Sequence, residues 1–439
     1  MAEDTGAAPP TATGGEAPAE YVRTNREALV SLALDLLAVE TSNPPGDTRE
    51  IVAAIERYLD PLPVDVERFA VDPAKANLLV RVPGESDRTL LYNGHLDTVP
   101  FDADAWTRDP LGERDDDRVY GRGATDMKGA VASMLFAIRA FAATDTEPPV
   151  DLLFAFVSDE EVGGDAGLPA LLDAGALDAE SFGADILDAD ACVIGEPTCE
   201  RGRHSVTVAD RGSIWLTLEA AGEAAHGSRP TLGVNAVDRL YDAVETLRDR
   251  FGSERLAIGA ETEPIVEESV AYYAPSMGEA AARDLFRYPS INLGVFEGGD
   301  AVNAVPGSAR AEIDVRLTAG VDTPEVLARI RECVADCEGI TVADASWSVG
   351  TAEDPDGPLV EAVASTAADV TGDRVFRRSA TGGGDAKKLR NAGISTVEFA
   401  LGTDTLHAPD EHVPVDALVG NAVVYARLPA AWRTEIDRE

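Results

Sequence analysis

The sequence predicts an α/β protein in which a mostly parallel sheet, covered by helices on both faces, is interrupted by an inserted domain. Short apolar runs such as LLFAFV at 152–157 alternate with helical segments, and strands that are apolar on both sides are typical of a covered parallel sheet. In 212–350 the expected order becomes strand, helix, strand, strand, helix, strand. This βαββαβ order is typical of a ferredoxin-like unit.

The length of the chain, 439 residues, exceeds what one hydrophobic core usually organises. We expect one domain made of 20–211 and 351–439, with 212–350 inserted as a second domain. Residues 1–19 are rich in Ala, Pro, Gly, Thr and Glu, a composition typical of a disordered acidic tail. The tail lacks the basic start and apolar core of a signal peptide.

The charge balance is strongly acidic, with 79 Asp and Glu against 37 Lys and Arg and a formal net charge of -42. Acids spread along the whole chain are typical of a halophilic protein, because concentrated salt screens their mutual repulsion. Binding of a basic partner is the alternative, although it usually requires an acidic block. Without a basic face or a long apolar run, neither nucleic-acid binding nor a membrane span is expected. We therefore expect a cytoplasmic, halophilic protein.

The expected elements of the first half follow from apolar periodicity and turn residues. A helical pattern over 25–40 stops at TSNPPGD, 41–47, where two prolines interrupt it. The segments that follow are a helix at 51–62, strands at 64–69, 76–84 and 89–95, an acidic loop at 102–118, a helix at 126–144, a strand at 151–157, a helix at 167–175 and a strand at 190–196.

The second half contains the inserted domain and the return to the first domain. Residues 252–288, with mixed acidic and aromatic content, are expected to be irregular. The expected elements of the inserted domain are strands at 213–222, 290–299, 309–319 and 340–349 and helices at 234–251 and 323–337. The return comprises a helix at 359–372, the glycine-rich TGGGD at 381–385, a strand at 395–402, a loop at 405–414 and a final helix.

Side chains of metal-ligand type gather where the expected strands end. In parallel sheets, sites collect at the carboxyl ends of the strands, so we expect these side chains to lie together. Two His and several carboxylates, without Cys, suit one or two divalent ions in a hydrolytic site. The residues are His95, Asp97, Asp126, Glu160, Glu161, Glu196 and His407.

The spacing of these residues along the chain indicates which of them can bind metal, orient a ligand or accept a proton. His95 and Asp97 are two apart on an extended chain and point the same way, so that Asp97 can orient the ligand imidazole. Of the adjacent Glu160 and Glu161, one can bind metal while the other accepts the proton of the attacking water. One carboxylate can bridge two ions about 3.5–4 Å apart, and these ions clamp a hydroxide. Each motif taken singly also has an ordinary structural or surface interpretation.

A set of motifs in fixed order carries a family resemblance. They are GHLDTVP, GRGATDMKGA, SDEEVGG, IGEPT, AHGSRPTLGVNA, NAVP and LHAPDEH. Together they resemble the co-catalytic zinc amidohydrolases, which include acetylornithine deacetylase, succinyl-diaminopimelate desuccinylase, aminoacylase and glutamate carboxypeptidase. The resemblance covers nearly all of the chain from about Tyr21 and is nearest to the acetylornithine deacetylase and succinyl-diaminopimelate desuccinylase branch.

The resemblance implies two divalent metal ions per chain, most typically Zn²⁺, with Co²⁺ or Mn²⁺ as alternatives. By position, it implies that one ion is held by His95 and Glu196 and the other by Glu161 and His407, with Asp126 bridging them. Glu160 is implied as the general base and Asp97 as the orienting residue. The resemblance also implies a cis peptide bond between Asp126 and Met127.

The resemblance implies that 20–211 and 351–439 form a metal-binding catalytic domain. It implies that 212–350 is a lid and dimerisation domain, which forms a homodimer through sheet edges and helices. His226 would reach the site of the partner subunit and stabilise the oxyanion as a preorganised donor; an ordinary polar loop is the alternative. Asn303 and Arg316 match positions that contact a substrate carboxylate, for which the guanidinium fork is suited. Arg316 can instead pair with an acid of the lid.

The glycine-rich segment supplies the last implied contacts. Gly382 and Gly383 match a family segment whose backbone lines the substrate pocket. Gly384 departs from the pattern, since relatives often have a hydroxyl residue there.

These observations predict an amide hydrolase that acts on a small N-acyl amino acid, of deacetylase or desuccinylase type. A dipeptidase or carboxypeptidase of the same family is the alternative, because the motifs do not resolve the residues that choose the acyl group. A hypothesis from another class is a catalytically silent dimer that binds metal or ligand on the same fold.

Overall fold

The computed structural model describes residues 15–173, 185–199 and 202–438, and the chain divides into two compact units. The first unit comprises the described residues of Met1–Thr207, Pro355–Phe376 and Gly384–Glu439. The second comprises Val208–Asp354 and Arg377–Gly383. Sequence reasoning left 377–383 in the catalytic domain, whereas these residues contact the second unit, in which the amide of Arg211 donates to the carbonyl of Gly382 at 3.3 Å.

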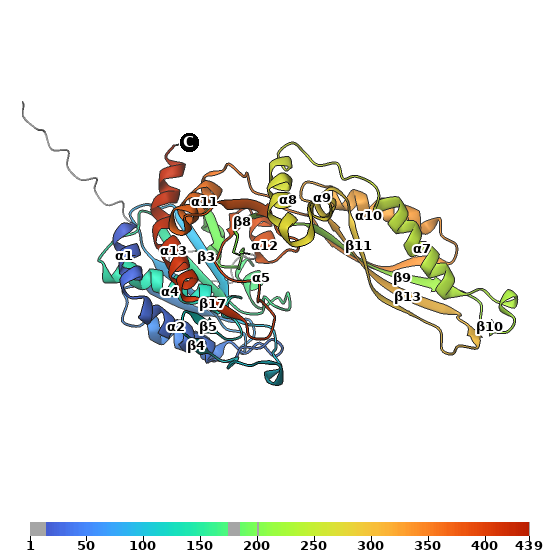
Figure 1. Cartoon of the computed structure of the whole chain (residues 1–439), viewed down its shortest axis with the longest axis horizontal. Helices are drawn as coiled ribbons and strands as arrows, with labels where there is room; N and C mark the ends of the chain where they lie inside the picture. Colours follow the sequence, from blue (N-terminus) through green and yellow to red (C-terminus); the bar gives the residue numbers. More distant parts are fainter. Residues whose placement is uncertain (1–14, 174–184, 200–201, 439) are drawn as a thin grey trace, which may run out of the picture. The chain divides into compact units, whose positions relative to one another are not determined.

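An eight-stranded mixed sheet forms the centre of the first unit, in the order β1-β2-β6-β3-β7-β16-β8-β15. Figure 1 labels β3 and β8 of this sheet. The four strands β6, β3, β7 and β16 run parallel, while β1 and β2 are antiparallel additions at one edge. The strands are β1 Asp65–Phe69, β2 Asn77–Val82, β3 Thr89–His95, β6 Asp151–Val157, β7 Ala191–Ile194, β8 His204–Ala209, β15 Val375–Ser379 and β16 Ser395–Glu398.

Helices cover both faces of this sheet, as the apolar strands predict. On one face Leu91 and Leu153 form a core with Leu168 of α5 and Leu389 of α12. On the other, the hydroxyl of Tyr92 on β3 donates to a carbonyl of α13 at 2.8 Å. The helices are α1 Glu16–Thr24, α2 Arg26–Leu37, α3 Arg49–Leu59, α4 Lys128–Ala143, α5 Leu168–Leu171, α11 Pro358–Thr371, α12 Asp385–Asn391 and α13 Val415–Ile436, with short 3₁₀ turns at Ala103–Ala105 and Ile186–Asp188.

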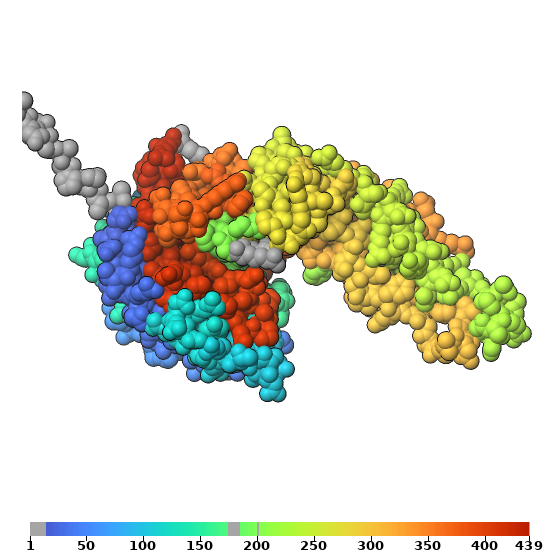
Figure 2. All heavy atoms as spheres, in the orientation of Figure 1, coloured from blue at the N-terminus to red at the C-terminus, as the bar shows by residue number. Residues whose placement is uncertain are grey.

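Two expectations for the first unit were wrong. Residues 16–19 belong to helix α1 rather than to a disordered tail, because Ala19 and Val22 are buried where α1 packs against α13; residues 1–14 lie outside the described part of the chain. In Figure 2 the amino-terminal helices and α13 form adjoining surface. The expected loop 102–118 contains β4 Glu113–Asp115, which pairs with β5 Arg118–Tyr120, and β5 pairs with β17 His412–Pro414.

The second unit contains a four-stranded antiparallel sheet in the order β11-β13-β9-β14, with α7 and α10 packed against it. The order and connections are those of a ferredoxin-like βαββαβ unit. The elements are β9 Gly212–Ala221, α7 Ala236–Phe251, β11 Ser290–Gly298, β13 Ser308–Leu317, α10 Thr323–Ala335 and β14 Ile340–Ser348, with the short pair β10 Ala225–His226 and β12 Ala304–Val305 and a 3₁₀ turn at Pro230–Leu232.

The expected irregular stretch 252–288 is instead largely helical, with α8 Glu263–Met277 and α9 Glu279–Arg287. Val266 of α8 and Phe286 of α9 are buried. Arg287 is also buried and reaches the carboxylates of Glu263 and Glu267. The acidic residues are therefore ion-pair partners on a helix. No helix in the described part of the chain is long and apolar enough to cross a bilayer.

Candidate metal centre

Parallel strand ends bring the first ligands to one edge of the large sheet. β3 ends at His95, β6 ends directly before the segment that carries Glu160 and Glu161, and β7 ends two residues before Glu196. Because β6, β3 and β7 are hydrogen-bonded neighbours running in the same direction, their carboxyl ends converge. Asp126 precedes α4.

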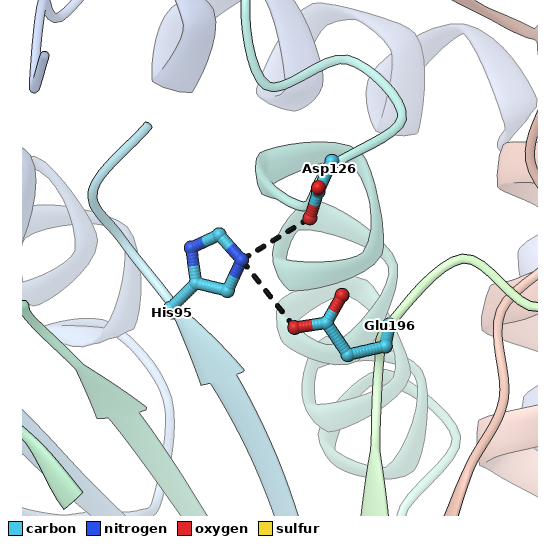
Figure 3. Close-up of side chains that lie close together, drawn as sticks. All are labelled: His95, Asp126 and Glu196. Carbon is cyan, nitrogen blue, oxygen red and sulfur yellow. Dashed lines mark hydrogen bonds and ion pairs between the residues drawn. The ribbon is translucent and has the colours of Figure 1, made fainter. Parts of the chain in front are cut away.

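The first group of donors consists of His95, Asp126 and Glu196 (Figure 3). The Nε2 atom of His95 lies 3.2 Å from Oδ1 of Asp126 and 3.5 Å from Oε1 of Glu196. The Nδ1 atom of the same ring lies 2.9 Å from the backbone oxygen of Asp97. Because a carbonyl only accepts, Nδ1 carries the proton and Nε2 presents its lone pair to the group, as a metal ligand does.

The second group consists of Asp126, Glu161 and His407. The Nε2 atom of His407 lies 3.2 Å from Oδ2 of Asp126 and 3.3 Å from Oε2 of Glu161. Asp126 thus offers Oδ1 to one group and Oδ2 to the other. Within each group the donor atoms lie within 4.8 Å of one another, and imidazole and carboxylate donors suit divalent ions. The residues therefore fit two ions bridged by Asp126.

The pKa shifts of residues in the two groups indicate an excess of negative charge in the site. Burial raises the pKa of Glu196 well above its usual range, and the nearby charge of Asp126 raises it further. Hydrogen bonds to Asp126 and Glu161 raise the pKa of His407 to about 10. Carboxylates gathered in a buried place are costly unless a cation compensates them. Divalent ions would provide that compensation.

Glu160 has the properties of a proton acceptor. Burial raises the pKa of Glu160 to about 7, and the charges of Asp385 and Glu161 contribute in the same direction, whereas His95 opposes them. A carboxylate with a pKa near neutrality can take up and release a proton at working pH. No donor group found in the described part of the chain includes Glu160.

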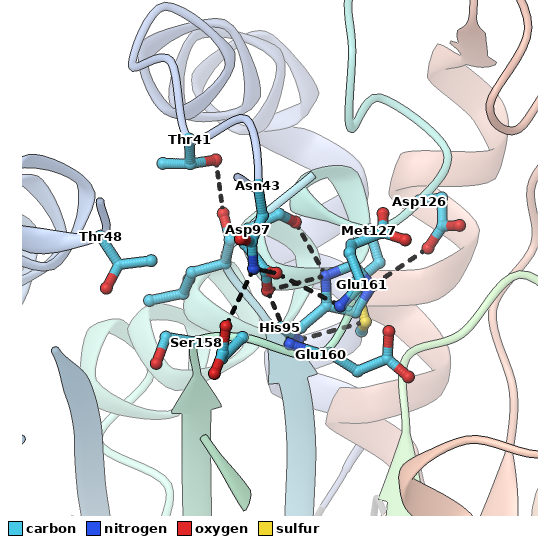
Figure 4. A network of polar contacts seen from close by, with 12 residues as sticks. Thr41, Asn43, Thr48, His95, Asp97, Asp126, Met127, Ser158, Glu160 and Glu161 are labelled. Atoms are coloured by element: carbon cyan, nitrogen blue, oxygen red, sulfur yellow. Dashed lines mark hydrogen bonds and ion pairs between the residues drawn. The ribbon is translucent and has the colours of Figure 1, made fainter. Parts of the chain in front are cut away.

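Asp97 acts through different atoms than the sequence suggested. Its backbone carbonyl, not its carboxylate, holds the ring of His95, since Oδ1 is 3.8 Å from Nδ1. The buried carboxylate instead accepts hydrogen bonds from the amides of Glu160, at 3.1 Å, and Glu161, at 3.2 Å (Figure 4). The contact expected between Asp97 and its histidine is thus made by the backbone carbonyl, because the carboxylate is engaged by the two amides of the loop after β6.

Sequence reasoning missed Glu411, which holds the loop before α4. Its carboxylate is buried and accepts from the amides of Asp126, at 3.0 Å, and Thr125, at 2.9 Å, and it forms an ion pair with Arg122. Glu411 belongs to the motif LHAPDEH. The sequence alone does not distinguish it from a surface acid, because its role follows from its burial in the fold. The implied cis bond between Asp126 and Met127 is confirmed.

The expected lid residues lie in the second unit. His226 is exposed on β10, and its Nδ1 lies 2.8 Å from the hydroxyl of Ser228. The carbonyl of Asn303 accepts from the amide of Gly227 at 2.6 Å. Arg316 donates to Asp314 at 2.8 Å, which is the lid-acid pairing considered as the alternative to substrate binding. Gly382 and Gly383 are also in the second unit.

Comparisons with known proteins identify relatives of this chain. The signature of peptidase family M20/M25/M40 matches residues 91–431. A succinyl-diaminopimelate desuccinylase of Rhodospirillum centenum is 31% identical over 360 residues, which cover 81% of this chain and 84% of that protein.

Two solved structures share the fold at low identity. A metallo-carboxypeptidase of Sulfolobus solfataricus superposes with a TM-score of 0.74 and 20% identity over 92% of this chain and 99% of that one. Human carnosine dipeptidase 1 gives a TM-score of 0.70 and 19% identity over 97% and 100% of the two chains. On the extent of the signature and of the identity to the Rhodospirillum protein, the chain belongs to peptidase family M20/M25/M40.

Proposed function

We propose that this chain is a two-metal hydrolase that cleaves the amide bond of an N-acyl amino acid, of the succinyl-diaminopimelate desuccinylase type. One observation carries the proposal: Asp126 offers one oxygen to His95 and the other to His407, beside a half-buried Glu160 that neither of these two donor groups uses. The Rhodospirillum relative, a succinyl-diaminopimelate desuccinylase, supports the choice of acyl substrate.

The metal ions are most typically Zn²⁺, with Co²⁺ or Mn²⁺ as alternatives. His95 and Glu196 would hold one ion, Glu161 and His407 the other, and Asp126 both. When bound, the ions polarise the acyl carbonyl and lower the pKa of water.

Within the first unit, Glu160 takes the proton of the attacking water and passes it to the amine that leaves. The proton thus moves from the water to a carboxylate oxygen of Glu160 and then to the nitrogen of the broken amide. The backbone carbonyl of Asp97 keeps the proton of His95 on Nδ1, and its carboxylate fixes the backbone of Glu160.

In the second unit, we assign binding and oxyanion roles. His226, supplied by a second subunit of a homodimer joined through the lid, donates to the oxyanion. Asn303 and Arg316 bind the carboxylate of the amino acid, and the backbone of Gly382 and Gly383 lines the pocket. In that case Arg316 exchanges Asp314 for the substrate carboxylate.

A dipeptidase or carboxypeptidase activity is the second candidate, favoured by the names of the two solved structures with this fold. The two activities share the metal centre and differ in what lies beyond the scissile bond. A catalytically silent binding protein has less support, because all five ligand positions and Glu160 are present.

The test is to purify the chain in molar KCl, measure bound metal, and assay a panel of substrates. The panel contains N-succinyl-diaminopimelate, N-acetylornithine, other N-acyl amino acids and dipeptides. Two ions per chain with turnover of the succinyl substrate is the expected result, and preference for dipeptides would favour the second candidate. Glu160→Gln should abolish turnover while both ions stay bound. Full metal occupancy without turnover on any substrate would contradict the proposal.

A further inference from the structure

The loop TSNPPGD at 41–47 lies against the segment that carries the first metal ligand. The hydroxyl of Thr41 donates to the carbonyl of Leu96 at 2.7 Å, and the amide of Thr98 donates to the carbonyl of Thr41 at 3.2 Å. The amide of Asn43 donates to the carbonyl of Thr98 at 2.8 Å. Three backbone-anchored bonds therefore fix Asn43 relative to the residues after β3.

The side chain of Asn43 lies between two buried carboxylates. Its Nδ2 atom is 2.8 Å from Oδ2 of Asp97 and 3.1 Å from Oδ1 of Asp159 (Figure 4 shows the contact with Asp97). Asn43, Asp97 and Asp159 are 3%, 0% and 4% exposed. One amide group thus uses both of its hydrogens to join two acids that would otherwise repel each other in a poorly solvated place.

Both carboxylates lie next to the segment that carries the proposed base, Glu160. Asp97 accepts from the amides of Glu160 and Glu161. Asp159 directly precedes Glu160, has a positive φ of 65°, and is paired with the ammonium of Lys75. A non-glycine residue in this backbone region requires support from its surroundings. Asn43 and Lys75 contact the side chain of Asp159 and supply that support.

Lys75 is notable because the chain has only four lysines among its 37 basic residues. Its side chain is 19% exposed, against 5% for that of Asp159. The ammonium of Lys75 lies against the carboxylate of Asp159, and a hydrogen bond between two charged groups is stronger than one between neutral groups. Asn43 and Lys75 therefore hold the same loop through the same atom, since both donate to Oδ1 of Asp159.

We propose that Asn43 is a positioning residue for Glu160, and that Lys75 assists it by neutralising Asp159. The bridge from Asp97 through Asn43 to Asp159 fixes the backbone of residues 159–161, and with it the direction of the Glu160 carboxylate. The catalytic consequence rests on the function proposed above, whereas the structural consequence does not.

The structural consequence is tested in metal-free protein by hydrogen exchange followed with mass spectrometry. In Asn43→Ala, peptides covering 158–162 should exchange at least about tenfold faster, because the amides of Glu160 and Glu161 lose a fixed acceptor. Peptides from β3 should be unchanged. Asn25→Ala is the matched control, since Asn25 also donates from Nδ2, to the carbonyl of Tyr21 at 2.8 Å, outside this loop.

The catalytic consequence is tested with metal-loaded enzyme in molar KCl. Asn43→Ala and Lys75→Met should each lower kcat by about 10- to 100-fold, with KM within about twofold and two ions still bound. Lys75→Arg should restore most of the lost kcat. The partly exposed Lys75 also gives a variant that keeps its fold if Asn43→Ala does not.

Unchanged exchange at 158–162 together with unchanged kcat in Asn43→Ala would overturn the proposal. Protection lost evenly over the first unit in both Asn43→Ala and Lys75→Met would overturn it as well, because the residues would then be merely structural. If the unaltered enzyme turns over no substrate, the proposed function fails, and the exchange measurement still decides the structural claim.

Discussion

The buried carboxylate of Glu411 accepts a hydrogen bond from the backbone amide of Asp126, at 3.0 Å. An acid from near the end of the chain thus fixes the backbone of the residue that both ligand groups share. The same carboxylate neutralises Arg122, whose side chain is 4% exposed. Removing Glu411 should therefore affect both the stability of the fold and the binding of metal.

We expect Glu411→Ala to lower the free energy of unfolding by about 3–5 kcal/mol, because it leaves the charge of Arg122 buried without its carboxylate partner. Chemical denaturation of the metal-free protein in molar KCl measures this loss. Metal affinity should fall by about 10- to 100-fold. Glu20→Gln, at an exposed pair with Arg23, is the control and should change neither quantity appreciably. Equal effects of the two substitutions would contradict the expectation.

Asp126→Asn should reduce metal binding at both positions, because the two oxygens of one carboxylate serve the two donor groups. Glu196→Gln should weaken one position only, since Glu196 belongs to a single group. Bound metal after dialysis, measured by elemental analysis, should fall from two ions per chain toward zero in the first variant and toward one in the second. Loss of one ion in both would show that Asp126 does not bridge.

Metal binding should release protons near neutral pH. In the metal-free protein the pKa of His407 is raised to about 10 by hydrogen bonds to Asp126 and Glu161, so the ring is protonated at pH 7.5 and must lose its proton to coordinate. Affinity should therefore rise with pH up to about 10. Calorimetric titration with zinc in buffers of different ionisation enthalpy counts the protons. His407→Ala should release fewer, and heats that do not depend on the buffer would be inconsistent with this.

The same shift gives a stability prediction with a defined sign. The pKa of His407 is higher in the folded protein than in the unfolded chain. The ion pairs of the protonated ring therefore contribute fully to the stability of the fold below about pH 6.5. This contribution is lost as pH rises through about 10. The metal-free protein should lose stability over this interval, and His407→Ala should lose less. Thermal unfolding at fixed salt between pH 6 and pH 10 measures the difference, and parallel curves for the two proteins would argue against it.

Salt should stabilise the fold. With 79 acidic and 37 basic residues, repulsion in dilute buffer is screened poorly, and the Debye length falls to about 3 Å at 1 M. We expect the Tm to rise by about 10 °C or more between low and molar KCl, since each kcal/mol shifts Tm by about 2–4 °C in a domain of this size. Sucrose, which is excluded from the surface without screening charge, is the control. A Tm that does not depend on KCl would refute the halophile hypothesis.

The two candidate donor groups could be anticipated because the strands that lead to them are easy to recognise in the sequence. β3 and β6 are almost wholly buried apolar runs, so His95 and Glu161 had to emerge at the same edge. The paired roles of Asp126 followed from the family resemblance, and the structure gives the distances. The atoms that Asp97 uses could not be predicted, because the choice between its carbonyl and its carboxylate depends on which amides the β6 loop presents.

The helices of 252–288 were missed for a physical reason. The acids of α8 interrupt its apolar pattern, and they are tolerated because the buried Arg287 pairs with Glu263 and Glu267. These ion pairs join two different helices, so they cannot be recognised from the spacing of residues within one helix. β8 was missed because its short run, His204–Ala209, gains its partners from distant segments.

The candidate ligands of the two donor groups are synthesised at different times, because they lie in different parts of the chain. His95, Asp126 and Glu196 all precede the inserted second unit, whereas His407 follows it, in the last tenth of the chain. During synthesis the residues of the first group have all emerged soon after β7, whereas the second group waits for His407, when the polypeptide is nearly finished. A chain truncated before β16 therefore contains every residue of the first group, but it lacks His407 of the second and also Glu411, which holds the backbone of Asp126.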